Sequence, residues 1–164
     1  MENPNPTSIM FKLIGEIIVE WAKAENIVDQ TAAMIEWRAS HPTGSHPNFT
    51  NMSLLRSFRH RRGHVRKLVE GFGMKEITAR LDEAYQMIAN ADKTRHSLAH
   101  DRIQVSVEGE SYTIRALRPG YRKNDGGAEK ILSHDDLLAA LKNLRSANTI
   151  MKMEVQATIF TKNV

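Results

Sequence analysis

The chain has 164 residues, of which 41% are hydrophobic and 26% are charged, and its formal net charge is +4. This length and balance predict one globular domain over residues 1–164 and exclude a disordered chain, while a modest positive charge does not by itself establish a nucleic-acid partner. The absence of cysteine excludes disulfides and thiolate metal sites. No apolar run is long enough to span a membrane, and the segment MENPNPTS lacks the features of a secretion signal. We therefore expect a cytoplasmic protein.

The first predicted helix runs from about Ser8 to Ser40, with Thr7 or Ser8 as its N-terminal cap. Apolar residues recur along it at spacings of three and four, which predicts one buried stripe. The stripe consists of Ile14, Ile17, Trp21, Ala24, Val28, Ala32 and Ile35. The segment HPTGSHP at residues 41–47 then predicts a loop, because proline and glycine end helices.

Two further helices follow this loop. The second is expected to begin near Asn51 or Ser53 and to end near Gly71, and the third to run from about Lys75 to the mid-nineties. After Asp101 the apolar period changes to two, over residues 103–107 and again over 112–116, with a turn at residues 108–110. This alternation predicts a β-hairpin.

The chain then predicts a loop over residues 117–130 and a last helix from Ser133 to roughly Phe160. Ser133 and Asp136 have the spacing of a capping box, with aspartate in the usual place of glutamate. The predicted fold is mostly α, an antiparallel four-helix bundle with a β-hairpin inserted between helices 3 and 4.

Positive charge is concentrated in the second helix. Six basic residues crowd twelve positions there: Arg56, Arg59, Arg61, Arg62, Arg66 and Lys67. Such a cluster is typical of a surface that binds phosphates, and we predict RNA contacts for Arg59, Arg62 and Arg66. The alternative interpretation is a solvated helix face without a partner. His60 and His64 lie one turn apart, but no third ligand completes a metal site, so neither a metal nor a cofactor is expected.

Two charged residues fall where the helical pattern calls for apolar ones. Glu25 stands four residues after Trp21 on the first helix, and Arg95 stands seven after Ile88 on the third. Because a lone buried charge is costly, each is expected to have a partner, and we predict that Glu25 and Arg95 face each other.

His100 follows Arg95 by five residues and is expected just past the end of the third helix. A neutral imidazole takes a proton from a hydroxyl at working pH, and a guanidinium binds a phosphate through two hydrogen bonds. A base and an anion clamp within a few ångströms suit cleavage of RNA by its own 2′-hydroxyl without a metal. The spacing of arginine and histidine alone is a weak pattern.

The segment Arg95-His96-Ser97-Leu98-Ala99-His100 resembles the signature of the HEPN superfamily of helical-bundle proteins. That signature is an arginine, commonly followed by Asn, Asp or His, and a histidine four to six residues beyond, near the end of a long helix. The segment around Trp21 and Glu25 is similar to members in which a glutamate supports the signature arginine. The hairpin followed by a closing helix is similar to variants with an insertion after the histidine.

The resemblance implies a metal-independent endoribonuclease that cleaves single-stranded RNA and leaves a 2′,3′-cyclic phosphate. Arg95 would hold the phosphate, His100 would act as base or acid, His96 would support binding, and Asp101 would orient the imidazole of His100. Active members typically form homodimers in which two signatures share a cleft, and many belong to toxin–antitoxin or antiviral-defence systems. RNA, a second copy and an antitoxin protein are therefore the expected partners.

One position departs from some toxins of this family. They carry a tyrosine two residues after the signature histidine, which a partner enzyme modifies, whereas this chain has Arg102 there. The sequence therefore gives no support for neutralisation by this route, and the question of a partner stays open. The alternative to the enzyme is a non-catalytic HEPN-like helical bundle that binds RNA or a partner protein, and a third interpretation is a helical interaction protein without a nucleic-acid ligand.

Overall fold

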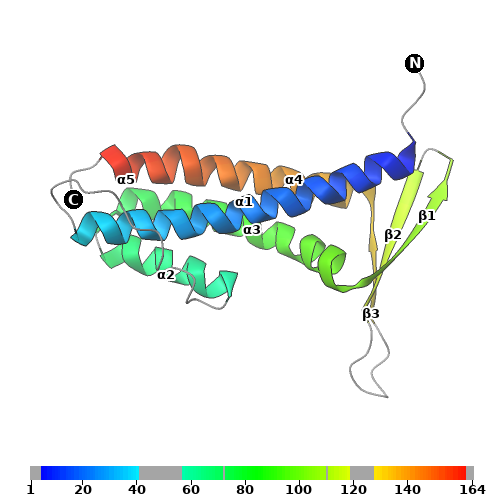
Figure 1. Cartoon of the computed structure of the whole chain (residues 1–164), viewed down its shortest axis with the longest axis horizontal. Coiled ribbons are helices and arrows are strands. Elements are labelled where there is room, and N and C mark those ends of the chain that lie inside the picture. The colour runs from blue at the N-terminus through cyan, green and yellow to red at the C-terminus, as the bar shows by residue number, and fades with distance from the viewer. Residues whose placement is uncertain (1–4, 41–56, 72, 110, 119–127, 162–164) are drawn as a thin grey trace. The chain divides into compact units, whose positions relative to one another are not determined.

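The computed structural model describes residues 5–40, 57–71, 73–109, 111–118 and 128–161, and the chain is mostly helical with a small antiparallel sheet (Figure 1). In chain order the elements are α1 (Pro6–Ser40), α2 (Phe58–Gly71), α3 (Lys75–His100), β1 (Arg102–Glu108), β2 (Ser111–Arg118), β3 (Ala128–Leu132), α4 (His134–Thr149), the π-helix η2 (Ile150–Gln156) and α5 (Ala157–Thr161). No helix within these described ranges is both long and apolar enough to cross a membrane. The loop predicted at 41–47 and the helix start predicted near Asn51 or Ser53 lie outside them.

The chain divides into two compact units. One contains Met1–Trp21 and Ala89–Leu144, and the other contains Ala22–Ile88 and Arg145–Val164. Helices α1, α3 and α4 each contribute residues to both. The interpretation of residues 1–164 as a single domain stays a prediction.

Helix α1 begins slightly earlier than predicted. The side chain of Asn5 caps it, since its Oδ1 accepts a hydrogen bond from the backbone N–H of Thr7 at 3.0 Å. Pro6 occupies the first helical position, where its missing N–H would be unpaired in any case. The cap predicted at Thr7 or Ser8 is therefore wrong by two or three residues, because the proline was read as preceding the helix rather than opening it.

The first unit holds the sheet, in the order β1-β2-β3. The predicted hairpin is present: Glu108 pairs with Ser111 across its turn, where Gly109 has a positive φ of 60°. The loop predicted over 117–130 is wrong at its end, because β3 pairs antiparallel with β2. Sequence patterning missed this strand because five residues are too few to display a clear alternation. The buried residues of this unit come from both helices and sheet: Met10, Leu13, Ile17, Trp21, Ala91, Tyr112, Ile114, Ala116, Leu132, Leu137, Leu141 and Leu144.

The second unit is built from helices. A glycine ends α2: Gly73, with a φ of 68°, donates to the carbonyl of Glu70 at 3.0 Å, and the N–H of Met74 reaches Val69 O, also at 3.0 Å. This pattern terminates a helix with a left-handed residue and satisfies its last carbonyls. The apolar core of the unit includes Ala24, Val28, Ala32, Ile35, Phe58, Val65, Val69, Ile77, Leu81, Ala84, Ile88, Met151, Val155 and Ile159.

The sequence predicts one continuous last helix. In the structure, the seven-residue π-helix η2 interrupts this helix. At its end Gln156 is 9% exposed, and its amide donates to Thr31 Oγ1 at 3.1 Å. Thr31, fully buried on α1, donates in turn to the carbonyl of Ile27 at 2.7 Å. The wider turns thus coincide with a buried polar network, which apolar periodicity does not detect.

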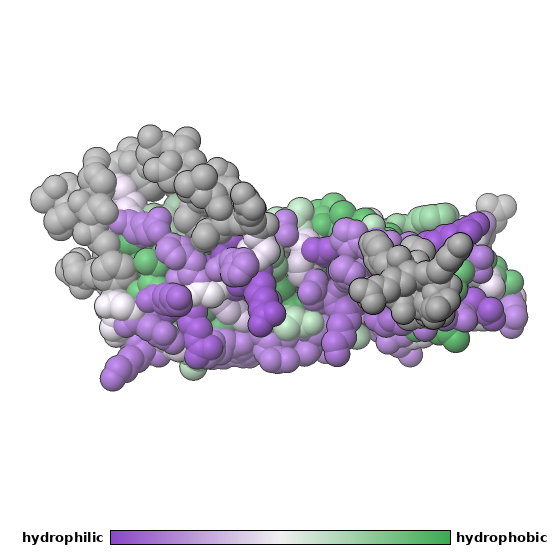
Figure 2. Space-filling model, turned by 90° about the horizontal axis from the view of Figure 1, so that it is seen from below, coloured by the Kyte–Doolittle hydropathy of each residue, from purple (hydrophilic) through white to green (hydrophobic). Residues whose placement is uncertain are grey.

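The predicted capping box of the last helix is confirmed. Ser133 Oγ accepts from the N–H of Asp136 at 3.1 Å, and the Asp136 carboxylate accepts from the N–H of Ser133 at 2.8 Å. These hydrogen bonds lower the pKa of Asp136. The face shown in Figure 2 is mostly hydrophilic, with scattered apolar side chains.

Candidate functional site

The candidate site lies at the C-terminal end of α3, which extends further than predicted. The helix continues through His100, and the backbone N–H of Asp101 still donates to the carbonyl of Ser97 at 3.1 Å. The expectation that His100 lies just past the end of this helix is therefore wrong. Because His100 belongs to the helix, Arg95 and His100 are fixed relative to each other by one continuous helix rather than by a loop.

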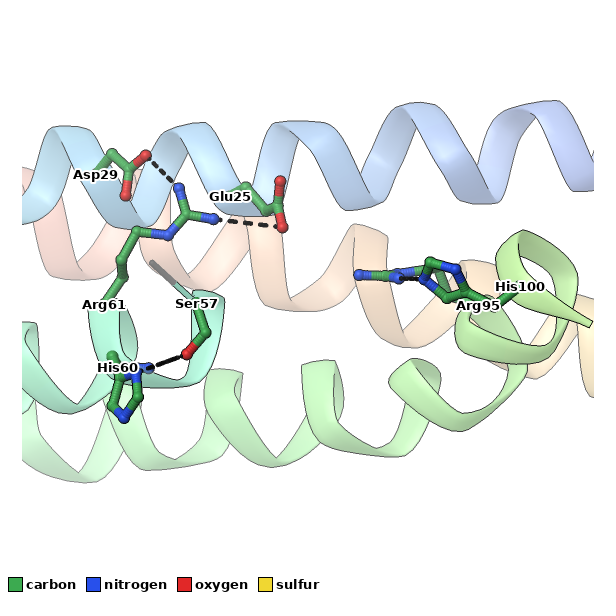
Figure 3. Close-up of polar contacts among 7 residues, drawn as sticks. All are labelled: Glu25, Asp29, Ser57, His60, Arg61, Arg95 and His100. Carbon is green, nitrogen blue, oxygen red and sulfur yellow. Dashed lines mark hydrogen bonds and ion pairs between the residues drawn. The ribbon is translucent and has the colours of Figure 1, made fainter. Parts of the chain in front are cut away.

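Arg95 and His100 approach each other side by side (Figure 3). The distance between Arg95 Nη1 and His100 Nε2 is 3.5 Å, the outer limit of a hydrogen bond. A guanidinium only donates, so this contact requires Nε2 to carry the lone pair of a neutral imidazole. The imidazole of His100 is exposed, and Arg95 is half-buried. The pair therefore combines a fixed positive charge with a solvent-accessible proton acceptor.

An aromatic ring supports the guanidinium of Arg95. Its Cζ lies 4.2 Å from the centroid of the Trp21 ring, and Trp21 itself is 7% exposed. Trp21 was predicted only as a core residue, and this contact with Arg95 was missed. A cation over the face of tryptophan is held electrostatically and by van der Waals contact, so the ring fixes the plane of the arginine fork.

No carboxylate forms an ion pair with Arg95 in the part of the chain that the structure describes. Its Nε is buried and makes no hydrogen bond there. Among the described residues, the contacts of this guanidinium are with the face of Trp21 and with Nε2 of His100. Such a guanidinium is electrostatically disposed to bind an anion that reaches it from solvent.

The two other residues predicted for this site flank His100. The rings of His96 and His100, one helical turn apart, have centroids 4.7 Å from each other and planes inclined by 49°, and both are exposed. His96 is therefore placed beside His100, and its role in binding stays a prediction. Asp101 follows directly in the chain and is half-buried. Its role in orienting the imidazole stays a prediction.

Glu25 has a described ion pair with a residue other than Arg95, and the facing of Glu25 and Arg95 stays a prediction. Its carboxylate lies 3.4 Å from the guanidinium of Arg61, on α2, whereas Arg95 contacts Trp21 and His100. Arg61 also binds Asp29 at 2.7 Å, so one guanidinium bridges two carboxylates that lie four residues apart on α1 (Figure 3). The pattern of Glu25 and Arg95 on apolar stripes does not predict this arrangement. Nothing in the sequence distinguishes Arg61 from the basic residues around it.

The bridged acids differ from ordinary surface carboxylates. The side chain of Asp29 is 30% exposed and that of Arg61 only 18%. Burial raises the pKa of Asp29, and the attraction of Arg61 offsets this rise only in part. The aspartate was not singled out from the sequence. Its signal was available, since Glu25 and Asp29 form an acidic pair one turn apart beside the apolar stripe.

Of the three arginines predicted to bind RNA, two are engaged within the chain. Arg62 lies between the rings of Phe58 and Tyr85, at 5.2 and 5.6 Å, and donates to the carbonyl of Tyr85 at 3.2 Å. Arg66 pairs with Glu70 at 3.0 Å, and also with Asp82 at 3.3 Å. Arg59 is exposed, and its contact with RNA stays a prediction. The basic run of α2 thus binds neighbouring helices as well as facing solvent.

The histidines of α2 also have local partners. Ser57 caps the helix, and its Oγ lies 2.8 Å from Nδ1 of His60 (Figure 3). His64 Nε2 lies 2.7 Å from the carboxylate of Glu36. Within the described ranges no group of three or more His, Cys, Asp or Glu residues is placed to hold a metal ion.

Comparisons with known proteins give no relative for this chain: no family model matches it, and no match is found among curated proteins or solved structures. The chemistry of the site therefore rests on its residues alone.

Proposed function

We propose that this chain is a metal-independent endoribonuclease of the HEPN type, in which Arg95 and His100 cleave single-stranded RNA. The observation that carries the proposal is the Arg95 guanidinium. It is held 4.2 Å from the Trp21 ring and 3.5 Å from an exposed imidazole, without an ion-pair partner among the described residues. The four-helix arrangement with an inserted sheet and the single domain over 1–164 are parts of the same proposal.

The reaction follows from the two side chains. A phosphate oxygen of bound RNA takes over the N–H of Arg95, which frees the lone pair of His100 Nε2. The imidazole then removes the proton of the 2′-hydroxyl, the 2′-oxygen attacks phosphorus, and the bond to the 5′-oxygen breaks. The guanidinium stabilises the charge that grows on the phosphoryl oxygens. The products are a 2′,3′-cyclic phosphate and a 5′-hydroxyl, whose proton comes from water or from the His100 of a second copy.

The assignment of a second copy and of further partners belongs to this proposal. In HEPN enzymes two signatures commonly share a cleft, which supplies one imidazole as base and another as acid. A homodimer of this kind and an antitoxin or antiviral context are implied by the resemblance alone, and the cytoplasmic location is proposed from the sequence composition. His96, whose ring lies beside that of His100, would contact the RNA backbone.

Cleavage of an unstructured RNA in EDTA tests the proposal. Replacing both Arg95 and His100 by alanine should lower the cleavage rate by roughly 10²-fold or more, the usual contribution of general acid–base catalysis. Arg80→Ala is the control, because it removes one positive charge from an exposed position on α3, where Arg80 pairs with Glu83 and Glu154. If the wild type cleaves no faster than the double variant, the enzymatic proposal is wrong.

A specific contact favours one alternative. Because Arg95 rests on the buried Trp21 ring, it also suits a structural arginine in a non-catalytic domain that binds RNA or a protein. In that case Arg95→Ala lowers the melting temperature and leaves RNA affinity unchanged. Salt-dependent retention of RNA by the wild type would exclude the third interpretation, a helical protein without nucleic-acid contacts.

A further inference from the structure

The two outer strands of the sheet differ in how their free edges are protected. Neighbouring strands pair through their backbones, so an unprotected edge recruits another strand unless charges, proline or bulges prevent it. β3 carries Glu129 and Lys130 within its five residues. β1 is seven residues long, and the five between Arg102 and Glu108 include no charged residue, proline or glycine. Among the strands that the structure describes, β1 is the outer strand whose edge lacks such protection.

The apolar face of the sheet continues onto β1 and is left open there. Val105 pairs with Ile114 and Val107 with Tyr112, and residues directly opposite on paired strands point to the same face. Ile114 is fully buried and Tyr112 is 7% exposed, whereas Val105 is 38% and Val107 46% exposed. The core therefore covers this face at β2 and leaves it exposed at β1.

The sequence of β1 is complementary to itself in the antiparallel direction. With Val105 opposite Val105 of a second copy, Arg102 faces Glu108, Ile103 faces Val107, and Gln104 faces Ser106. Opposite charges meet at both ends, and apolar side chains meet between them on one face. A register shifted by one residue would place the apolar side chains of the two copies on opposite faces. A shift by two would separate arginine from glutamate.

We propose that β1 pairs antiparallel with β1 of a second copy about a twofold axis at Val105, joining the two sheets into one of six strands. The pairing extends the apolar face across both copies and forms two Arg102–Glu108 ion pairs. It is an interaction surface separate from the Arg95–His100 site. The two Arg102 residues lie six strand positions apart in this pairing, about 20 Å, and each Arg95–His100 pair lies beyond an opposite end, so this contact does not bring the pairs into one cleft.

A thiol at the twofold axis tests the pairing directly. The chain contains no cysteine, so Val105→Cys introduces its only thiol. Opposed Cβ atoms in an antiparallel pair lie about 4.5–5.5 Å apart, close enough for a disulfide after a small adjustment. We expect mild oxidation to link most of this variant into dimers. Ile131→Cys, on β3, is the control: this position is 60% exposed against 38% for Val105, and the variant should nevertheless run largely as a monomer in non-reducing electrophoresis. Equal linkage of both variants, or none of Val105→Cys, would overturn the proposal.

Charge reversal tests the register. Arg102→Glu places glutamate opposite Glu108 and should weaken association at least tenfold in sedimentation velocity, and Glu108→Arg should do the same. The double reversal restores opposite charges and should restore association, as should mixing the two single variants. Failure of both rescues would overturn the register. RNA cleavage should survive in Arg102→Glu, so a loss of self-association and a loss of nuclease activity are separate results.

Discussion

Two arginines show how different surroundings give one side chain different roles. Arg61 bridges Glu25 and Asp29 at 3.4 and 2.7 Å, so its charge is compensated inside the chain. Arg95 lies over Trp21 and beside His100, with no carboxylate in ion-pair distance among the described residues. A compensated guanidinium joins helices, whereas one held only by an aromatic face and an imidazole is suited to bind an added anion.

This comparison also changes the interpretation of the basic run in α2. Arg61, Arg62 and Arg66 bind acids, rings or carbonyls on neighbouring helices. A run of positive charge in a sequence is therefore weaker evidence for nucleic-acid binding than a single arginine that lacks an acidic partner. The chain places such an arginine beside a histidine, where acid–base chemistry can follow.

The largest expected effect separates the two arginines by activity. Arg95→Ala should reduce RNA cleavage by roughly 10²-fold, because the phosphate loses its clamp. Arg95→Lys retains the charge but not the planar fork, and we expect it to lose on the order of tenfold. Arg61→Ala, measured at a temperature at which it is folded, should cleave at the wild-type rate. Equal losses in the Arg61 and Arg95 variants would remove the distinction between them.

The next effect separates them by stability. Arg61→Ala leaves two half-buried carboxylates one turn apart without their cation, and we expect the free energy of unfolding to fall by about 2 kcal/mol in urea denaturation. Arg95→Ala loses a cation–π contact and should lower it by about 1 kcal/mol or less. Arg61→Lys keeps the charge, and its free energy of unfolding should lie between those of the wild type and the alanine variant.

A reversed order of these stabilities would contradict the comparison. If Arg95→Ala were the more destabilised variant and cleavage were unchanged, Arg95 would be the structural arginine. The alternative of a non-catalytic domain would then be favoured.

Sequence patterns predicted the parts of this molecule that depend on local chemistry. The helical stripe through Ile17 and Val28, the hairpin at Gly109 and the Ser133 cap each follow from residues near one another in the chain. Periodicity also identified Arg95 as a charge on an apolar stripe, and the structure describes it as half-buried.

The contacts that the sequence did not predict join residues distant in the chain. Glu25 was assigned to Arg95 because both interrupt apolar stripes, but its described ion pair is with Arg61, a residue that no periodic pattern distinguishes from its basic neighbours. The buried Gln156–Thr31 hydrogen bond was missed for the same reason, whereas strand β3 was missed because five residues are too few to show a clear alternation. The spacing of apolar residues predicts which face of a helix is buried. It does not predict which polar group on a neighbouring element contacts that face.

A smaller loss of unfolding free energy is expected at the capping box of α4. This loss measures what a purely local polar contact contributes, for comparison with the bridge of Arg61. Ser133→Ala removes the acceptor for the N–H of Asp136 and the donor to its carboxylate, and we expect a loss of about 1 kcal/mol in thermal or urea denaturation. Cleavage should not change. A loss comparable to that of Arg61→Ala would show that the bridged arginine is no more important to stability than one helix cap.

The smallest effect is a difference in pH dependence between two aspartates. Hydrogen bonds from Ser133 lower the pKa of Asp136, so its stabilising contribution is present above the ordinary carboxyl pKa and is lost as pH falls through the lowered value. Burial raises the pKa of Asp29, so the folded state holds that proton more tightly than the unfolded chain, and the contribution of Asp29 declines as pH rises through the raised value. Unfolding free energies of Asp29→Asn and Asp136→Asn, each compared with the wild type between pH 3 and 7 (roughly the carboxyl range), should therefore change in opposite directions with pH. A flat profile for Asp29→Asn would mean that Arg61 compensates the burial of Asp29 in full, and a profile parallel to that of Asp136→Asn would mean that the attraction of Arg61 outweighs the burial.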